Sequence, residues 1–360
     1  MLFKTQSAVV ALGLLPLIGS VATVAAAETS SFNQVFQSIP ASKPGSCASY
    51  DMDSVTTDAL TLCNNAIAAL QTLTATNGIS NSKKNVDRLE MAQTVWGIDW
   101  NPSKFGFMGG KHTITQGMNY LTTAMSNLQK VQTMLKSTSP GDAKAVCGDT
   151  DWLWVTKRKD WGYVTDADQL ISEFWGLDPN NHPGFWMSNY FSSYMKDKSG
   201  QDTKMRSQQG MIIINDEGST SAEDNICKPN PQLAETWMNG NNVIMLCDGV
   251  LGLNSVQDAI NSQSSLSPGS SIDDSARIAG AYLLHELMHY TSNRVIGDTI
   301  VGQREVGGKK VGGQKAYDWD AVAAVSYEGK DPTENADNYR MWAVGTTLDQ
   351  VQWSLEGRVQ

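Results

Sequence analysis

The segment Ala281-Tyr-Leu-Leu-His-Glu-Leu-Met-His-Tyr290 contains two histidines four residues apart, with a glutamate directly after the first. On an α-helix, residues four apart lie on one face, so His285 and His289 can bind the same metal ion. Glu286 then lies beside a metal-bound water as a candidate general base. Because the chain has only four histidines, chance rarely produces this spacing. The segment therefore predicts a zinc-binding helix with hydrolytic chemistry.

The apolar residues around this segment predict how the helix packs. Residues 271–274 (Ser-Ile-Asp-Asp) suit a helix start, because Ser caps helices and Asp favours their first turn. We expect the helix to continue to Met288, with its apolar residues in the core and the histidines facing a cleft. A Gly-rich loop at residues 294–316 follows, and then two shorter helices at 320–327 and 334–344.

Periodicity elsewhere predicts a mainly helical chain with a small sheet. Apolar residues recur at steps of three and four in residues 55–76 and 114–135, which predicts two amphipathic helices. Residues 210–215 and 242–247 are short apolar runs bounded by turn residues, which predicts two strands. A strand edge near a zinc site can bind an extended peptide by strand addition.

A catalytic zinc ion normally has three protein ligands and an open position for water. The extended motif in which a third histidine binds is excluded, because Val295 stands at that position. A glutamate on a later helix is one possible third ligand. Glu334 is the best placed, with Glu305 and Glu328 behind it.

Residues 225–345 resemble the deuterolysin-like aspzincins and the fungal peptidyl-Lys metalloendopeptidases. In these enzymes HExxH is followed by GTxDxxYG and then by an Asn-Ala-Asp-x-Tyr helix. Here Ile296-Gly-Asp298 places an aspartate nine residues after His289, and Asn335-Ala-Asp-Asn-Tyr339 matches the later helix. The resemblance implies that Asp298 is the third zinc ligand, in preference to a glutamate.

The sequence departs from this family between the aspartate and the later helix. The Gly-Thr pair is missing and Val301 stands at the tyrosine position. We interpret the long loop as an insertion that moves the tyrosine to Tyr317, whose phenol would hydrogen-bond the oxyanion. If this alignment is wrong, Asp318 and Asp320 become rival ligands, although Asp residues also commonly begin helices.

These observations together predict an α+β, zincin-like metallopeptidase, mostly helical with a small sheet beside the HExxH helix. One Zn²⁺ per chain would be held by His285, His289 and Asp298. Glu286 would take a proton from the attacking water, and the zinc ion would polarise the peptide carbonyl. The resemblance further implies that Asp337 lines the pocket for the residue after the cleaved bond and prefers Lys there. Protein or peptide substrates are the expected partners.

The N-terminus predicts secretion. Residues 1–27 combine Lys4, an apolar run and small residues before Glu28, as in a cleaved signal peptide. Residues 28–46 are rich in Ser and Pro, which predicts a tether or short propeptide rather than core. We divide the remainder into a helical, aromatic-rich part at 47–205 and a catalytic part at 206–360. The mature chain should be a soluble extracellular monomer.

Charge and cysteines constrain partners and compartment. The formal net charge of −10 argues against binding to nucleic acid or to anionic membranes. Five cysteines in a secreted chain imply two disulfides and one free thiol. We pair Cys227 with Cys247 across a turn-rich segment, whereas the partner of Cys147 is left open between Cys47 and Cys63.

Two alternatives remain open at this stage. The first is a degenerate aspzincin-like protein that has lost activity and serves as a secreted binding or effector protein. The second is an aromatic-rich surface or carbohydrate-binding protein in which HExxH is incidental, because residues 151–195 are dense in Trp, Tyr and Phe. Stoichiometric metal without proteolysis would support the first, and absence of metal the second.

Overall fold

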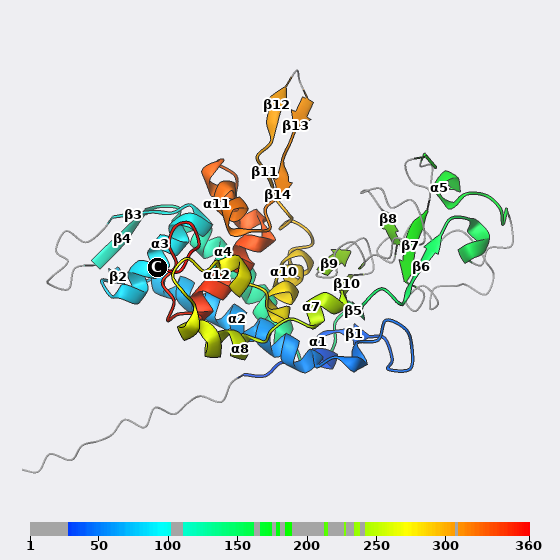
Figure 1. Cartoon of the computed structure of the whole chain (residues 1–360), viewed down its shortest axis with the longest axis horizontal. Helices are drawn as coiled ribbons and strands as arrows, with labels where there is room; N and C mark the ends of the chain where they lie inside the picture. Colours follow the sequence, from blue (N-terminus) through cyan, green and yellow to red (C-terminus); the bar gives the residue numbers. More distant parts are fainter. Residues whose placement is uncertain are drawn as a thin grey trace, which may run out of the picture.

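The computed structural model describes residues 28–101, 111–161, 166–174, 178–180, 184–188, 212–214, 227, 234–237, 242–306 and 309–360. Figure 1 shows helices gathered around one core, a small sheet beside them, a projecting hairpin, and a second sheet towards one end. The expected signal peptide, residues 1–27, lies outside the described residues. Among the described helices, none is long and apolar enough to cross a bilayer.

Four of the described helices contribute most to the core: α2 (Met52–Leu73), α4 (Met118–Leu135), α10 (Ala279–Thr291) and α12 (Ala336–Thr347). The other described helices of four or more residues are α1 (Phe32–Val35), α3 (Lys83–Trp96), α5 (Ile171–Phe174), α7 (Asp248–Leu251), α8 (Val256–Ser262), α9 (Ile272–Ser275) and α11 (Trp319–Tyr327). Short 3-10 helices include η2 (Arg158–Trp161) and η5 (Pro332–Glu334).

The helix expected between residues 55 and 76 is confirmed as α2, which the Asp51 carboxylate caps by accepting from the Ser54 amide. α10 crosses α2 at close range because Gly280 has no side chain. A β-carbon at residue 280 would lie 2.5 Å from that of Asp58 and 2.7 Å from the Ala59 amide nitrogen. The helix that carries HExxH is thus fixed against the longest helix of the described chain.

A four-stranded sheet lies beside α10, in the order β1 (Gln37–Ser38), β5 (Lys144–Cys147), β10 (Val243–Leu246) and β9 (Ala234–Trp237). The first three strands are parallel, and β9 runs antiparallel to β10 at the edge. Ile244 and Leu246 face the helical core, whereas Met245 faces Trp152 and Trp186. The central strand β10 is buried on both faces, as its unbroken apolar run predicts.

The remaining strands form smaller sheets outside this core. These are β2 (Ile79–Ser80), β4 (Lys111–Gln116) and β3 (Asp99–Asn101); β6 (Trp152–Val155), β7 (Phe185–Ser188) and β8 (Ile212–Ile214); and the pairs β11 (Ile300–Val301) with β14 (Gln314–Lys315) and β12 (Arg304–Val306) with β13 (Lys309–Val311). The last two pairs continue one another as a hairpin that projects from the helices (Figure 1).

The HExxH helix begins later than its sequence predicts. In place of one helix starting within residues 271–274, the chain forms α9 and then a separate α10 from Ala279. Ile278 between them is extended and pairs with Asn254, whose carbonyl accepts from the Ala279 amide at 3.3 Å. This long-range pairing overrides the helical pattern.

The boundaries of other helices and strands also differ from those that the local sequence pattern predicts. The helix expected at 114–135 begins at Met118, because Ile114 belongs to β4 and Gly117, at φ 80°, ends that strand. The strands expected at 210–215 and 242–247 are observed as the shorter β8 and β10. The last two expected helices are observed as α11 and, two residues late, α12.

Residues 28–46 were expected to lie outside the core, and the structure corrects this. Phe32, Val35 and Phe36 are buried in the main core, and β1 from this segment joins the sheet. The apolar residues of a Ser- and Pro-rich segment therefore pack as core. The parts 47–205 and 206–360 also share one core, because α2 and α4 pack with α10 and α12.

Two disulfides connect the sheet to its surroundings. Cys227 is bonded to Cys247, which confirms the expected pair, and Cys47 is bonded to Cys147. Cys63 is the free, buried thiol. The disulfides are compatible with an oxidising, extracellular compartment.

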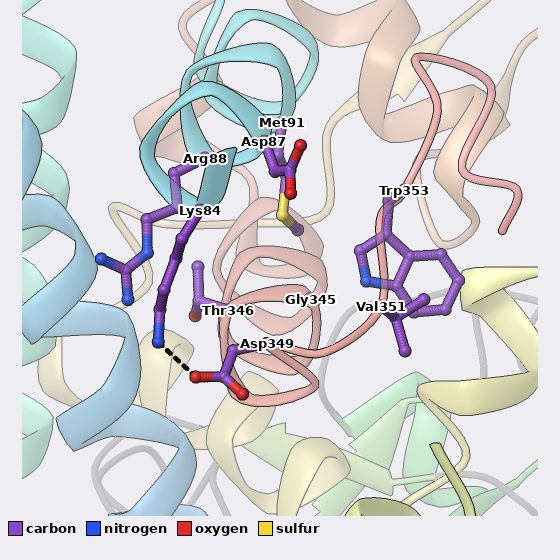
Figure 2. Close-up of a pocket in the computed structure, with 9 residues that line it drawn as sticks. All are labelled: Lys84, Asp87, Arg88, Met91, Gly345, Thr346, Asp349, Val351 and Trp353. Atoms are coloured by element: carbon purple, nitrogen blue, oxygen red, sulfur yellow. Dashed lines mark hydrogen bonds and ion pairs between the residues drawn. The ribbon is translucent and has the colours of Figure 1, made fainter. Parts of the chain in front are cut away.

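A hollow between α3 and the end of α12 is shown in Figure 2. Lys84 and Asp349 form an ion pair at the hollow, and Arg88, Thr346 and Trp353 contribute to its walls. Its volume of about 20 Å³ is room for one water molecule. The hollow is therefore too small for a metabolite or peptide side chain.

Candidate metal centre

The two histidines of the motif lie on consecutive turns of α10 and face each other. His285 and His289 are each 8% exposed, and their Nε2 atoms are 3.0 Å apart. Their rings are nearly perpendicular, with centroids 4.7 Å apart. The four-residue spacing on one helix face produces this convergence.

Hydrogen bonds on the far side of each ring determine which nitrogen is free. His285 Nδ1 lies 2.7 Å from a carboxylate oxygen of Asp337, and His289 Nδ1 lies 2.9 Å from the carbonyl of Ile296. A carbonyl or carboxylate only accepts, so both Nδ1 atoms are donors. In neutral imidazoles both Nε2 atoms then carry lone pairs, which repel each other unless a proton or a cation lies between them.

Asp298 provides the third converging donor atom. Its Oδ1 lies 3.3 Å from His285 Nε2 and 3.3 Å from His289 Nε2. This oxygen is buried and makes no hydrogen bond of standard geometry. In the described residues, His285, His289 and Asp298 form the group whose donor atoms lie within 4.8 Å of one another. Two imidazoles and an otherwise unsatisfied carboxylate oxygen fit a transition-metal ion.

The backbone that carries Asp298 is held on both sides. Asn293 and Arg294 have positive φ angles of 52° and 60°, which reverse the chain after α10. Gly297 then donates its amide to the Glu334 carbonyl at 2.9 Å and accepts from the Ala336 amide at 3.0 Å. The Asp298 carboxylate is therefore fixed between the HExxH helix and the start of α12.

A buried ion pair supports His285 from behind. Asp337 is 1% exposed, and its Oδ2 accepts from Arg340 Nη2 at 2.9 Å. Arg340 Nε pairs with the other carboxylate oxygen at 2.8 Å, and Nη2 also donates to the Tyr317 carbonyl at 2.7 Å. Asp337 was expected to contact substrate. The structure instead places it behind His285, where a carboxylate orients an imidazole.

Glu286 belongs to the same group of buried polar and charged side chains. It is 2% exposed, with Oε1 3.9 Å from His285 Nε2. Its Oε2 accepts from the hydroxyl of Thr236 at 2.7 Å. The candidate general base is therefore directed towards the point where the histidines and Asp298 meet.

Tyr317 reaches the centre from the base of the projecting hairpin. Its hydroxyl donates to Asp298 Oδ2 at 2.9 Å, and its ring centroid is 6.0 Å from that of His285. The side chain is 43% exposed, so it lies at the solvent side. Lys315, on β14, brings its ammonium within 3.7 Å of Asp298 Oδ2. The base of the hairpin thus places a phenol and a cation beside the cluster.

The rival carboxylates lie elsewhere. Asp318 caps α11 by accepting from the Ala321 amide at 2.8 Å. Asp320 and Glu334 are exposed and belong to no metal-binding group of the described residues. Glu328 accepts from the Gly302 amide and pairs with Lys330. The side chain of Glu305 lies outside what the structure describes.

The close approach of these buried side chains shifts the pKa values of several of them. Burial opposes charge on His285, but Asp337 and Asp298 outweigh it and raise the pKa of His285 to about 10. Burial would raise the pKa of Asp298, yet the two histidines hold that pKa well below its usual range. Burial and then Glu286 raise the pKa of Glu235 to about 7. The carboxylates of the centre therefore favour a positive charge at His285.

Comparison of the chain with protein-family models, with curated proteins and with solved structures returned no match.

The sequence did not indicate three residues of this centre. Thr236 belongs to the short β9, which carries no periodicity that would predict a strand facing α10. Lys315 reaches the cluster only because the hairpin folds back. Arg340 has a detectable signal, since it stands three residues after Asp337 on one helix, where an ion pair forms readily.

Proposed function

We propose that the chain is an extracellular zinc metalloendopeptidase. The observation that carries the proposal is the convergence of His285, His289 and Asp298 on one point, with Glu286 beside them. Two histidines and one carboxylate leave a fourth tetrahedral position open, which is the arrangement of a catalytic rather than a structural zinc site. The disulfides and the signal-like N-terminal sequence support an extracellular location.

The chemistry would be divided among the residues of the centre. Zn²⁺, when bound, supplies Lewis acidity and acidifies a water molecule. Glu286 takes the proton from the attacking water and passes it to the leaving amine. Tyr317, which donates to Asp298 here, donates instead to the developing oxyanion. Asp337 and Arg340 keep His285 in the tautomer that presents Nε2.

The edge of β9 that lies away from β10 offers a place for an extended substrate. Among the described strands, β9 pairs with β10 alone, and it lies next to α10. Strand addition at such an edge presents successive peptide carbonyls along the strand. We propose that the substrate pairs there, with its scissile carbonyl at the metal position.

A preference for Lys after the cleaved bond remains part of the proposal but gains no support from Asp337. Both carboxylate oxygens of Asp337 already have partners, and the side chain is buried. Glu235 is the carboxylate of β9 that has no such ion-pair partner among the described residues. A Lys preference that is unchanged in Asp337→Asn and lost in Glu235→Gln would assign the recognition to Glu235.

The function is tested by metal analysis and casein cleavage on the purified chain. We expect one zinc ion per chain. Glu286→Gln should keep the zinc and lose activity by several orders of magnitude, because hydrolysis needs the general base. Asp298→Ala should lose the zinc, whereas Asp320→Asn, a carboxylate outside the cluster, should retain both zinc and activity. Wild-type cleavage by Glu286→Gln would refute the mechanism.

One observation favours a second candidate, a zinc-binding but inactive protein that acts through binding. At the position of the family tyrosine, Val301 is buried, and Tyr317 is occupied by its hydrogen bond to Asp298. Full zinc occupancy with no cleavage of casein or of a peptide library would support this alternative.

A further inference from the structure

β9 contacts the general base through one side chain. Thr236 is 2% exposed, and its Oγ1 lies 2.7 Å from Glu286 Oε2 and 3.2 Å from the Glu286 carbonyl oxygen. Thr236 is paired with Ile244 across the sheet, and Ile244 lies on the face that packs on the helical core. Directly opposed residues share a face, so the strand register directs Thr236 at α10.

The backbone of the same residue is attached to the end of the HExxH helix. The Arg294 guanidinium donates to the Thr236 carbonyl. Arg294 is itself held by its amide, which donates to the His289 carbonyl at 2.9 Å. Thr236 is therefore fixed relative to α10 by its side chain and by its backbone.

This arrangement leaves the two oxygens of Glu286 in different surroundings. Oε2 is occupied by the threonine hydroxyl, while Oε1 points towards His285 Nε2, at 3.9 Å. A glutamate side chain has several rotatable bonds, so an unattached carboxylate would sample other orientations. The hydroxyl selects the one in which Oε1 faces the metal position.

We propose that Thr236 is a positioning residue for the general base: its hydroxyl holds Glu286 so that Oε1 faces the attacking water. The inference rests on the proposed peptidase function and adds a strand residue to it. The strand edge that would bind the substrate and the residue that orients the base are then the same four-residue segment, β9.

The test compares side chains at position 236 with and without a hydroxyl, as two pairs: the wild-type threonine with valine, and serine with alanine. Thr236→Val removes the hydroxyl from a residue of the same shape, and Thr236→Ser keeps it while Thr236→Ala does not. Misplacing a catalytic group costs up to about 100-fold in rate. We expect kcat to fall about 10- to 100-fold in Thr236→Val and Thr236→Ala, with KM and zinc content near wild type. Thr236→Ser should recover most of the kcat.

Thr346→Val is the matched control. Thr346 is also a buried threonine, but its hydroxyl bonds within its own helix, to the Trp342 carbonyl at 2.8 Å, and it lines the hollow of Figure 2. Its kcat should remain at the wild-type value. Wild-type kcat in Thr236→Val, or equal loss in Thr236→Ser and Thr236→Ala, would overturn the inference. An inactive wild-type chain would instead refute the proposed function.

A second readout requires neither metal nor activity. In the chelator-treated chain, Thr236→Val leaves the buried Glu286 carboxylate without its donor, which should lower the melting temperature. In a Glu286→Leu background the same substitution removes a hydroxyl that has lost its carboxylate partner, so the decrease should be clearly smaller. Equal decreases in the two backgrounds would show that Thr236 and Glu286 are not coupled.

Discussion

At the residue scale, the candidate centre is supported by a series of charged side chains that extends from His285 into the protein. His285 is bonded to Asp337, which is bonded to Arg340, and Arg340 also stacks over Tyr282 at 4.9 Å. Arg340 is 8% exposed, so its charge is compensated within the protein. A buried ion pair of this kind is costly to break, because either partner alone is an uncompensated charge.

Asp337→Asn should weaken zinc binding about 10- to 100-fold, because a carboxylate behind a histidine ligand raises the basicity of that ligand and fixes its orientation. Competition with a chromophoric chelator measures the affinity. Asp331→Asn is the control, since Asp331 accepts only from Thr333 at the start of η5. If zinc affinity were unchanged and peptide specificity altered, Asp337 would instead be assigned to substrate recognition.

Glu235 should make the metal-free chain sensitive to pH. Its pKa is raised to about 7 by burial and then by Glu286, from an ordinary value of 4.5. A carboxyl group whose pKa is raised by folding contributes its full stability below about pH 4.5. That contribution is lost as the pH rises through about 7.

Glu235→Gln should therefore stabilise the chelator-treated chain at pH 8, by about 1–3 kcal/mol, since one pKa unit corresponds to about 1.4 kcal/mol. The advantage should shrink towards zero near pH 4.5. Urea unfolding of both proteins at several pH values measures it. A constant difference across this range would contradict the raised pKa.

At the scale of the element, the sequence predicted what local periodicity controls. α2, α11 and the HExxH turn of α10 follow from apolar spacing, and β10 follows from its β-branched run. It did not predict β9 or the start of α10, because these depend on long-range pairs such as Ile278 with Asn254. In the site, the HExxH spacing predicted that the two histidines converge on one helix face. The residues that surround them come from other elements, and no local sequence pattern predicts their position.

The projecting hairpin provides a prediction of its own. Ile300 pairs with Lys315 and Val301 with Gln314, after which Gly302 and Gly313 both have positive φ, 73° and 103°. Two residues with positive φ suit a type I′ turn, so residues 303–312 can be excised and Gly302 joined to Gly313.

The shortened chain should keep its zinc and melt close to the wild-type temperature, because β11 and β14 still place Tyr317 and shortening a loop changes closure entropy only slightly. Zinc content and a thermal melt are the measurements. Loss of zinc would show that the distal strands β12 and β13 are needed to hold the centre.

At the scale of the whole molecule, the N-terminal part is structural support for the HExxH helix rather than a separate lobe. α2 and α4 pack on α10, and β5 joins the N-terminal residues to β10. The sequence suggested a division near residue 205 because the intervening segment is irregular and aromatic. Packing removes that division, since neither part alone can cover both faces of the sheet.

The two disulfides should contribute unequally to this single body. Cys47–Cys147 closes a separation of 100 residues, whereas Cys227–Cys247 closes one of 20. A crosslink stabilises mainly by restricting the unfolded chain, and its effect grows with the logarithm of the loop. Replacing both cysteines by alanine should therefore cost about 4.7 kcal/mol for the first pair and about 3.3 kcal/mol for the second.

Urea unfolding of the two double variants, each without reductant, provides the comparison. The first pair also joins the N-terminal segment to β5, so its loss should expose the packing of Phe32 and Phe36 to early proteolysis. The second pair lies on the other side of β10 and should leave that packing protected. If the Cys227–Cys247 variant were the less stable, native contacts around Cys227 rather than chain entropy would decide the stability of the molecule.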